Sequence, residues 1–83
     1  MTYLWFPAVG ITMQLHDGRL IAFHWHDREH GILLVTQHWR IDVAWWRVRM
    51  WRDYYRLVTD SGYLVLVYHD LLHQRWYLQK LYD

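Results

Sequence analysis

Residues 39–56 gather the side chains with the strongest binding chemistry, and they read WRIDVAWWRVRMWRDYYR. This segment holds four of the seven tryptophans and five arginines, and only two aspartates, Asp42 and Asp53, oppose them. Trp, Tyr and Arg dominate the energetic hot spots of protein interfaces. The same residue types bind single-stranded nucleic acid, where bases stack on rings and arginines contact phosphates. The composition therefore predicts a binding surface.

The tryptophans of this segment divide between structure and binding. Large rings are usually well buried, which favours a structural role for any single tryptophan, and we assign that role first to Trp39 and Trp51. Adjacent residues in an extended chain point to opposite faces, so at least one ring of the Trp45–Trp46 pair should lie outside the core. The predicted binding residues are Arg40, Trp45, Trp46, Arg47, Arg49, Trp51 and Arg52, with most weight on Trp45, Trp46 and the arginines beside them.

Three histidines in the first half offer a different chemistry. His24 and His26 are two residues apart in a strand-like run and should share a face, and His30 follows closely. Three imidazoles can hold zinc, but neither a cysteine nor a well-placed carboxylate completes a tetrahedral set. A zinc site at His24, His26 and His30 is therefore kept as an alternative, and we predict neither a metal nor a cofactor.

Catalytic motifs are lacking in the sequence. Ser61 is the only serine, and it lies in Asp60-Ser61-Gly62, which is typical of a turn. The sequence has no nucleophile elbow, no glycine-rich phosphate loop and no His-Glu-x-x-His. Because no cluster combines a base, a nucleophile and oxyanion donors, we predict that the protein is not an enzyme.

The bulk composition limits the remaining classes. Eighty-three residues make one domain, and the absence of cysteine excludes disulfides and thiolate metal sites. The net charge is only +1, so steering of nucleic acid by the whole chain would be weak. The apolar start of the chain is interrupted by Pro7 and Gly10, and we expect neither a signal peptide nor a membrane span. A cytoplasmic location is the resulting prediction.

The pattern of apolar residues and turns is that of β-structure throughout. We expect an N-terminal arm at residues 1–10 and one β domain at residues 11–83. The domain divides into two similar three-stranded meanders, at residues 11–40 and 54–83, and Asp17-Gly18 is a strong hairpin signal. Two curved meanders close into a small barrel of about six strands or pack as orthogonal sheets. The Trp/Arg segment then connects them, and Asp42 is a suitable cap for one short helical turn there.

Three stretches together resemble a known family. They are Trp39-Arg40-Ile41-Asp42 with Trp45-Trp46, then Trp51-Arg52-Asp53-Tyr54-Tyr55-Arg56-Leu57 with Thr59-Asp60-Ser61-Gly62, and finally Tyr68-His69-Asp70 with Trp76-Tyr77-Leu78 and Leu81-Tyr82-Asp83. The pattern is similar to the bacterial domain of unknown function numbered 6504, which occurs as short free-standing proteins. A similar pattern ends the inactive Y-family polymerase-like subunit of the bacterial mutasome, which supports error-prone translesion synthesis.

The resemblance implies a non-enzymatic interaction module that is accessory to DNA repair or translesion synthesis. Its partner would be a protein, such as a polymerase-type or mutasome component, bound through the Trp/Arg surface. The alternative is that the same surface binds single-stranded DNA or RNA. The sequence leaves the oligomeric state open.

Overall fold

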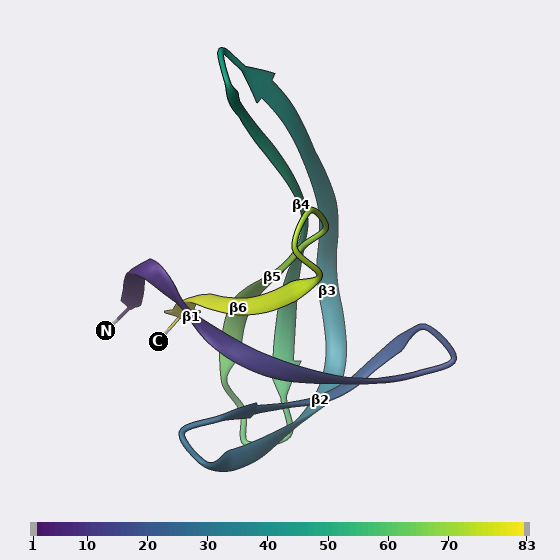
Figure 1. Ribbon diagram of the computed structural model, residues 1–83. Coiled ribbons are helices and arrows are strands. Elements are labelled where there is room, and N and C mark those ends of the chain that lie inside the picture. Colours follow the sequence, from purple (N-terminus) through teal and green to yellow (C-terminus); the bar gives the residue numbers. More distant parts are fainter. Residues whose placement is uncertain (1, 83) are drawn as a thin grey trace.

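Six antiparallel strands form one closed barrel in the computed structural model, which describes residues 2–82 (Figure 1). The strands are β1 (Tyr3–His16), β2 (Arg19–Trp25), β3 (Arg28–Trp45), β4 (Val48–Thr59), β5 (Leu64–Asp70) and β6 (Arg75–Tyr82). Each strand pairs with the next, and β6 closes the ring by pairing with β1. This confirms the predicted all-β class with a small six-stranded barrel. Among residues 2–82, no helix is long and apolar enough to cross a membrane.

Tight turns join β1, β2 and β3. Asp17 and Gly18 have φ values of 51° and 76°, as a type I′ hairpin turn requires at both central residues, so the predicted Asp-Gly hairpin is confirmed. His26 and Asp27 adopt the same left-handed region, with φ values of 54° and 56°. The turn between β2 and β3 is therefore two residues long, and β3 begins at Arg28.

Residues 3–10 are part of the barrel, which corrects the prediction of an N-terminal arm. β1 begins at Tyr3, and its first half pairs with β6, as in Tyr3 with Leu81 and Val9 with Leu78. Pro7 cannot donate a ladder hydrogen bond. The pairing register shifts between Leu4 and Val9, and this irregularity accommodates the proline within the strand.

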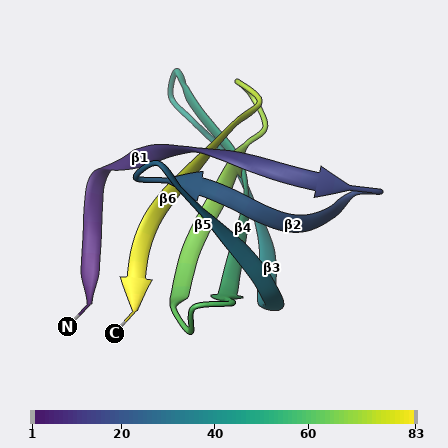
Figure 2. The same cartoon turned by 90° about the horizontal axis from the view of Figure 1, so that it is seen from below.

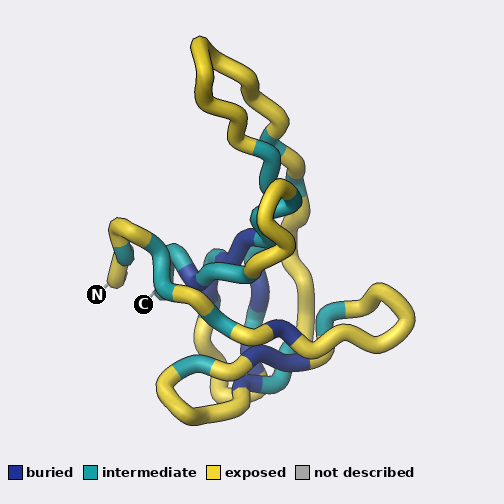
Figure 3. Tube along the Cα trace, viewed as in Figure 1, coloured by how far each residue is buried: buried dark blue, intermediate teal, exposed yellow. Residues whose placement is uncertain are grey.

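The core lies between the two meanders. Figure 2 shows β1 and β2 crossing over the sheet formed by β3 to β6. Alternate residues point inward, and the fully buried Phe23, Leu57, Val67 and Leu78 come from four different strands, β2, β4, β5 and β6. The buried residues of both halves form one cluster, so closure depends on both halves of the chain. Figure 3 shows the buried segments gathered in the barrel, whereas the hairpin is exposed toward its tip.

The connection between the meanders is a long hairpin, which corrects the prediction of a short helical turn. β3 has 18 residues and β4 has 12, and they pair without interruption from Gln37 with Arg56 to Trp45 with Val48. Valines, isoleucine and aromatic rings favour this extended pairing, so Asp42 lies within β3 and caps no helix. The hairpin projects from the barrel (Figure 1), and we call residues 39–54 the hairpin arm.

The core makes a direct prediction about stability. Leu57→Ala removes a side chain with 0% exposure, and the resulting cavity should lower the free energy of unfolding by about 2–5 kcal/mol in urea denaturation. Leu33→Ala is the matched control, because Leu33 is 68% exposed, and it should change stability by no more than about 0.5 kcal/mol. Equal effects of the two substitutions would contradict this placement of the core.

Candidate interaction surface on the hairpin arm

The pairing of β3 with β4 gives the hairpin arm two faces of opposite character. Cross-strand partners share a face, and neighbours along a strand point to opposite faces. We call one the apolar face: it carries Trp39, Ile41, Val43 and Trp45 from β3 and Val48, Met50, Arg52 and Tyr54 from β4. The other is the polar face, which carries Arg40, Asp42 and Ala44 from β3 and Arg49, Trp51 and Asp53 from β4.

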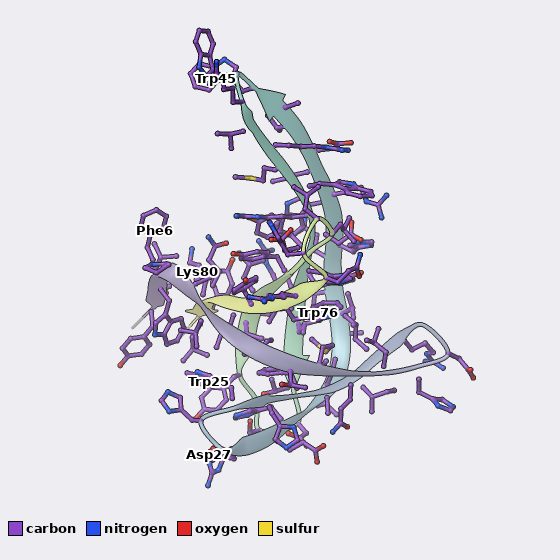
Figure 4. The ribbon with its side chains drawn as sticks, in the orientation of Figure 1. Phe6, Trp25, Asp27, Trp45, Trp76 and Lys80 are labelled. Atoms are coloured by element: carbon purple, nitrogen blue, oxygen red, sulfur yellow. The ribbon has the colours of Figure 1, made fainter. Side chains whose placement is uncertain are left out.

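The apolar face is uncovered toward the tip of the arm. Trp45 is 77% exposed and Val48 is 67% exposed, and Val43 and Met50 are exposed beside them. Trp46, in the turn itself, is 90% exposed. Figure 4 shows Trp45 at the end of the arm, far from Trp76 in the barrel. Contiguous exposed apolar side chains of this kind mark interaction sites.

A ladder of aromatic rings anchors the apolar face to the barrel. Ring centroids are 5.5 Å apart for Trp39 and Tyr54, 5.2 Å for Tyr54 and Tyr68, and 5.1 Å for Tyr68 and Tyr77. These residues lie on four neighbouring strands, and Tyr54 and Tyr68 are buried. Cross-strand aromatic pairs stabilise a sheet, so the base of the arm is held firmly.

Arg52 is the single charged residue of the apolar face, and it is engaged with this ladder. Its guanidinium carbon lies 4.3 Å from the centroid of the Tyr68 ring, and Nη1 donates to the Tyr54 hydroxyl oxygen at 3.1 Å. Burial raises the pKa of the Tyr68 phenol. The long side chain of Arg52 therefore lies on the apolar face and leaves that face largely hydrophobic.

The polar face is organised by a bidentate ion pair between Arg40 and Asp53. Arg40 Nε donates to Asp53 Oδ1 at 2.7 Å, and Nη2 donates to Oδ2 at 3.1 Å. His38 Nε2 lies 3.6 Å from the same carboxylate. The hydrogen bonds from Arg40 lower the pKa of Asp53 below its ordinary value, although burial of the carboxyl acts in the opposite direction. Arg40 is therefore held at the base of the arm by a charge on its own sheet.

Asp42 and Arg49 form a second pair nearer the tip. The shortest separation, between Arg49 Nη2 and Asp42 Oδ1, is 3.4 Å. The Arg49 guanidinium also lies over Trp51, 4.9 Å from the ring centroid, and Arg40 approaches the same ring at 6.0 Å. Two of the five arginines of the segment are thus paired with its two aspartates, which reduces the positive charge available to a ligand on this face.

The polar face continues into the mouth of the barrel as stacked rings. His38 stacks on Tyr55, and His69 stacks on Trp76, each pair with centroids 4.3 Å apart. Burial is the main cause that lowers the pKa of His69.

The turn at the tip holds Trp46 in an unusual backbone conformation. Trp46 has a φ of 61° in a two-residue turn between Trp45 and Val48. A left-handed conformation is uncommon for a bulky residue, and it costs about 1–2 kcal/mol. Strained residues of this kind cluster at functional sites, so the display of this ring at the tip is notable for function.

The structure divides the seven predicted binding residues among three places, which corrects the prediction of one common surface. Trp45 and Arg52 lie on the apolar face, Trp46 and Arg47 lie at the tip, and Arg40, Arg49 and Trp51 lie on the polar face. Trp39 and Trp51 are partly buried, as their predicted structural role requires. Sequence reasoning missed Ile41, Val43, Val48 and Met50. The signal was present, because apolar residues alternate with polar ones on both sides of the turn.

The histidines of the proposed zinc alternative do not converge. His30 is the cross-strand partner of Phe23 and stacks on it at 5.2 Å, whereas His24, the next residue along β2, points to the opposite face. His26 lies in the turn. Residues 2–82 contain no group of three or more His, Cys, Asp or Glu side chains that could hold a metal ion. The described residues therefore give no support to the alternative of a zinc site at His24, His26 and His30.

Comparisons of the chain with protein-family models, with curated proteins and with solved structures gave no match. The resemblance to the domain numbered 6504 therefore stays a prediction, and the role of the hairpin arm is argued from its own geometry.

The Arg40–Asp53 pair predicts an acid-dependent part of the stability. A carboxyl whose folded pKa lies below its unfolded value stabilises the fold above the unfolded pKa, near 3.9 for Asp as a rough reference, and loses this contribution as the pH falls through the folded pKa. Asp53→Asn should therefore lower the free energy of unfolding at pH 7. The difference from wild type should shrink in acid, as measured by urea denaturation across pH. Asp27→Asn, in an exposed turn, should follow the wild-type curve.

The backbone of the tip makes an independent prediction. Trp46→Gly removes the steric cost of the positive φ, and it loses almost no packing because the ring is exposed. The free energy of unfolding should therefore stay unchanged or rise by up to about 1 kcal/mol. Arg47→Gly is the matched control in the same turn, because Arg47 does not have a positive φ. There glycine removes no strain and only increases the conformational entropy of the unfolded chain, so this variant should be destabilised. Thermal unfolding of both variants checks this contrast, and a more stable Arg47→Gly would contradict it.

Proposed function

We propose that the protein is a non-enzymatic interaction module that binds a partner protein through the apolar face and the tip of the hairpin arm. The observation that carries the proposal is the row of exposed apolar side chains around Trp45 and Trp46 on a fully paired hairpin. Aromatic rings of this kind serve as anchors that fill pockets in a partner. Within residues 2–82, other side chains cover little of either ring.

The arm is suited to binding because it is already ordered. Its strands pair residue by residue up to the tip, and the aromatic ladder fixes its base. Binding to a preorganised element avoids much of the entropy cost of ordering a loop. The arm therefore presents its rings in one orientation, which favours a partner with a matching groove.

The chemistry of the arm indicates what this groove should contain. The apolar face needs an apolar groove, and Arg47 at the exposed tip favours acidic side chains at its rim. The resemblance to the domain numbered 6504 suggests a polymerase-type or mutasome component of error-prone translesion synthesis as the first candidate. We propose that this encounter takes place in the cytoplasm.

The charge distribution favours a protein over single-stranded nucleic acid. Arg40 and Arg49 are paired with Asp53 and Asp42, and they lie on the opposite face from Trp45. Nucleic-acid sites combine rings with a positively charged groove along one surface. Here the exposed rings and the paired arginines are separated, so nucleic-acid binding is treated as the competing outcome.

Trp45→Ala tests the proposal. Wild type, Trp45→Ala and Leu33→Ala serve as baits in an affinity pull-down. The partner is the protein that binds wild type and Leu33→Ala but does not bind Trp45→Ala. Leu33 is a matched control, because it is an exposed apolar residue of β3 outside the arm. In calorimetric titration with that partner, Trp45→Ala should cost about 2 kcal/mol or more, which is about a 30-fold loss of affinity.

A labelled single-stranded oligonucleotide separates the two functions. We expect no micromolar binding in fluorescence anisotropy at low salt. Binding that falls steeply with added salt, because bound phosphates release counterions, and that is lost in Trp45→Ala would replace the protein partner with nucleic acid. A partner bound equally by wild type and Trp45→Ala would also contradict the proposal.

A further inference from the structure

One edge of β3 is unpaired along most of its length. β2 pairs with β3 only at residues 28–31, and β4 occupies the other side of β3. Along residues 32–45, no other described strand pairs with this edge, and its far part projects away from the barrel (Figure 1). The register with β4 is irregular near the barrel, but it is regular from Gln37 to Trp45. The arm therefore presents a row of backbone donors and acceptors with which no described strand pairs.

This edge has few of the devices that prevent pairing. Natural proteins protect exposed edges with prolines, charged side chains (lysine above all), bulges or covering segments. The charged side chains of this edge, Arg40 and Asp42, have opposite signs. Residues 37–45 contain neither proline nor lysine, and their pairing with β4 has no bulge. The nine residues are long enough for a stable β-ladder, so the edge is available to another strand.

We propose that this edge pairs antiparallel with the same edge of a second copy of the chain, with the two-fold axis at Ile41. In this register, Ile41 faces the partner's Ile41. Arg40 faces the partner's Asp42, and Asp42 faces the partner's Arg40. Trp39 likewise faces the partner's Val43 on the apolar face. The sequence Trp39-Arg40-Ile41-Asp42-Val43 is thus complementary to itself when it is reversed.

Other registers lose this complementarity. Antiparallel pairing must keep apolar residues opposite apolar ones, so the axis must pass through a residue. An axis at Arg40 places two arginines opposite each other, and an axis at Asp42 does the same with two aspartates. An axis at Trp39 or Val43 leaves Arg40 and Asp42 without opposite charges. Of the five positions from 39 to 43, Ile41 alone pairs both charges favourably.

The existing ion pairs extend across this interface. Arg40 already binds Asp53 on its own sheet, and the partner's Asp42 would lie on its other side. Asp42 is directly opposite Trp51 within the chain and reaches Arg49 diagonally, at 3.4 Å. Each Asp42 would therefore lie between Arg49 of its own chain and the partner's Arg40. Opposite charges on neighbouring strands stabilise pairing, and like charges destabilise it.

The dimer leaves the apolar face open. Edge hydrogen bonds lie in the plane of the sheet, whereas Trp45, Val48 and Met50 project from one side of it. Pairing two arms would join their apolar faces into one larger surface. The proposal therefore goes beyond partner binding, and either interaction can fail without the other.

A cysteine at the predicted axis tests the register. The chain has no cysteine, so Ile41→Cys introduces one thiol that faces its own copy. Directly opposed residues of an antiparallel pair have Cα atoms about 4.5–5.5 Å apart, within the range of a disulfide. Val43→Cys is the control, because two residues 43 would be four positions apart along the strand, about 13 Å. Under mild oxidation, Ile41→Cys should form a covalent dimer at least ten times faster.

Charge reversal tests the same register without a covalent bond. Asp42→Arg places an arginine opposite Arg40 twice per dimer, so the dissociation constant should rise at least tenfold in sedimentation equilibrium. Glu29→Arg makes the same change of charge on β3 where β2 covers the edge, and it should leave the dissociation constant unchanged. Trp45→Ala should also still dimerise, which separates this test from that of partner binding.

Three results would overturn the proposal. The first is a wild-type protein that sediments as a monomer at its highest soluble concentration. The second is a Val43→Cys variant that cross-links as fast as Ile41→Cys. The third is an Asp42→Arg variant that dimerises as tightly as Glu29→Arg.

Discussion

The cross-strand register between β3 and β4, which is regular from Gln37 with Arg56 to Trp45 with Val48, is the constraint on which the rest of the structure depends. Within the barrel, this register directs Leu57 into the core, where it is fully buried. Beyond the barrel, the same alternation continues, but no opposite layer is present to receive the side chains. Arg40 and Asp53 therefore pair with each other, and so do Asp42 and Arg49. The arm is the part of the sheet that extends beyond the hydrophobic core.

Stacked rings at the base keep the arm rigid, and the exposed rings at its tip are the groups available for binding. Stacked rings on four strands hold the base, and two of them, Tyr54 and Tyr68, are buried. Toward the tip, the side chains of Trp45 and Trp46 contact little of their own chain. Burial of apolar surface is the main favourable term in association, so these rings can contribute more to binding than to folding. The two faces and the free edge offer three separate surfaces on one element.

Much of the fold could be predicted from local patterns. The Asp17-Gly18 turn and the two meanders follow from residue types that are close together in the sequence. The hairpin arm was harder to predict. Its high content of tryptophan and arginine draws attention to composition rather than to the alternation of apolar and polar residues along each strand. Counting every second residue on each side of Trp46 would have predicted the hairpin and its two faces. The expectation for residues 1–10 failed because Pro7 is a poor strand residue, and pairing with β6 overrides that preference.

The sequence by itself determined the β class, the turns, the concentration of rings and guanidinium groups, and the absence of thiol chemistry. Local pattern can show that two faces of a strand differ. Only the tertiary structure decided which face is covered, because burial requires a second layer from distant strands. Closure of β6 on β1 sets where that layer ends, and it leaves Trp45 outside while Leu57 is inside. The partners of Arg40 and Arg49 were decided in the same way, by a cross-strand register that no single segment contains.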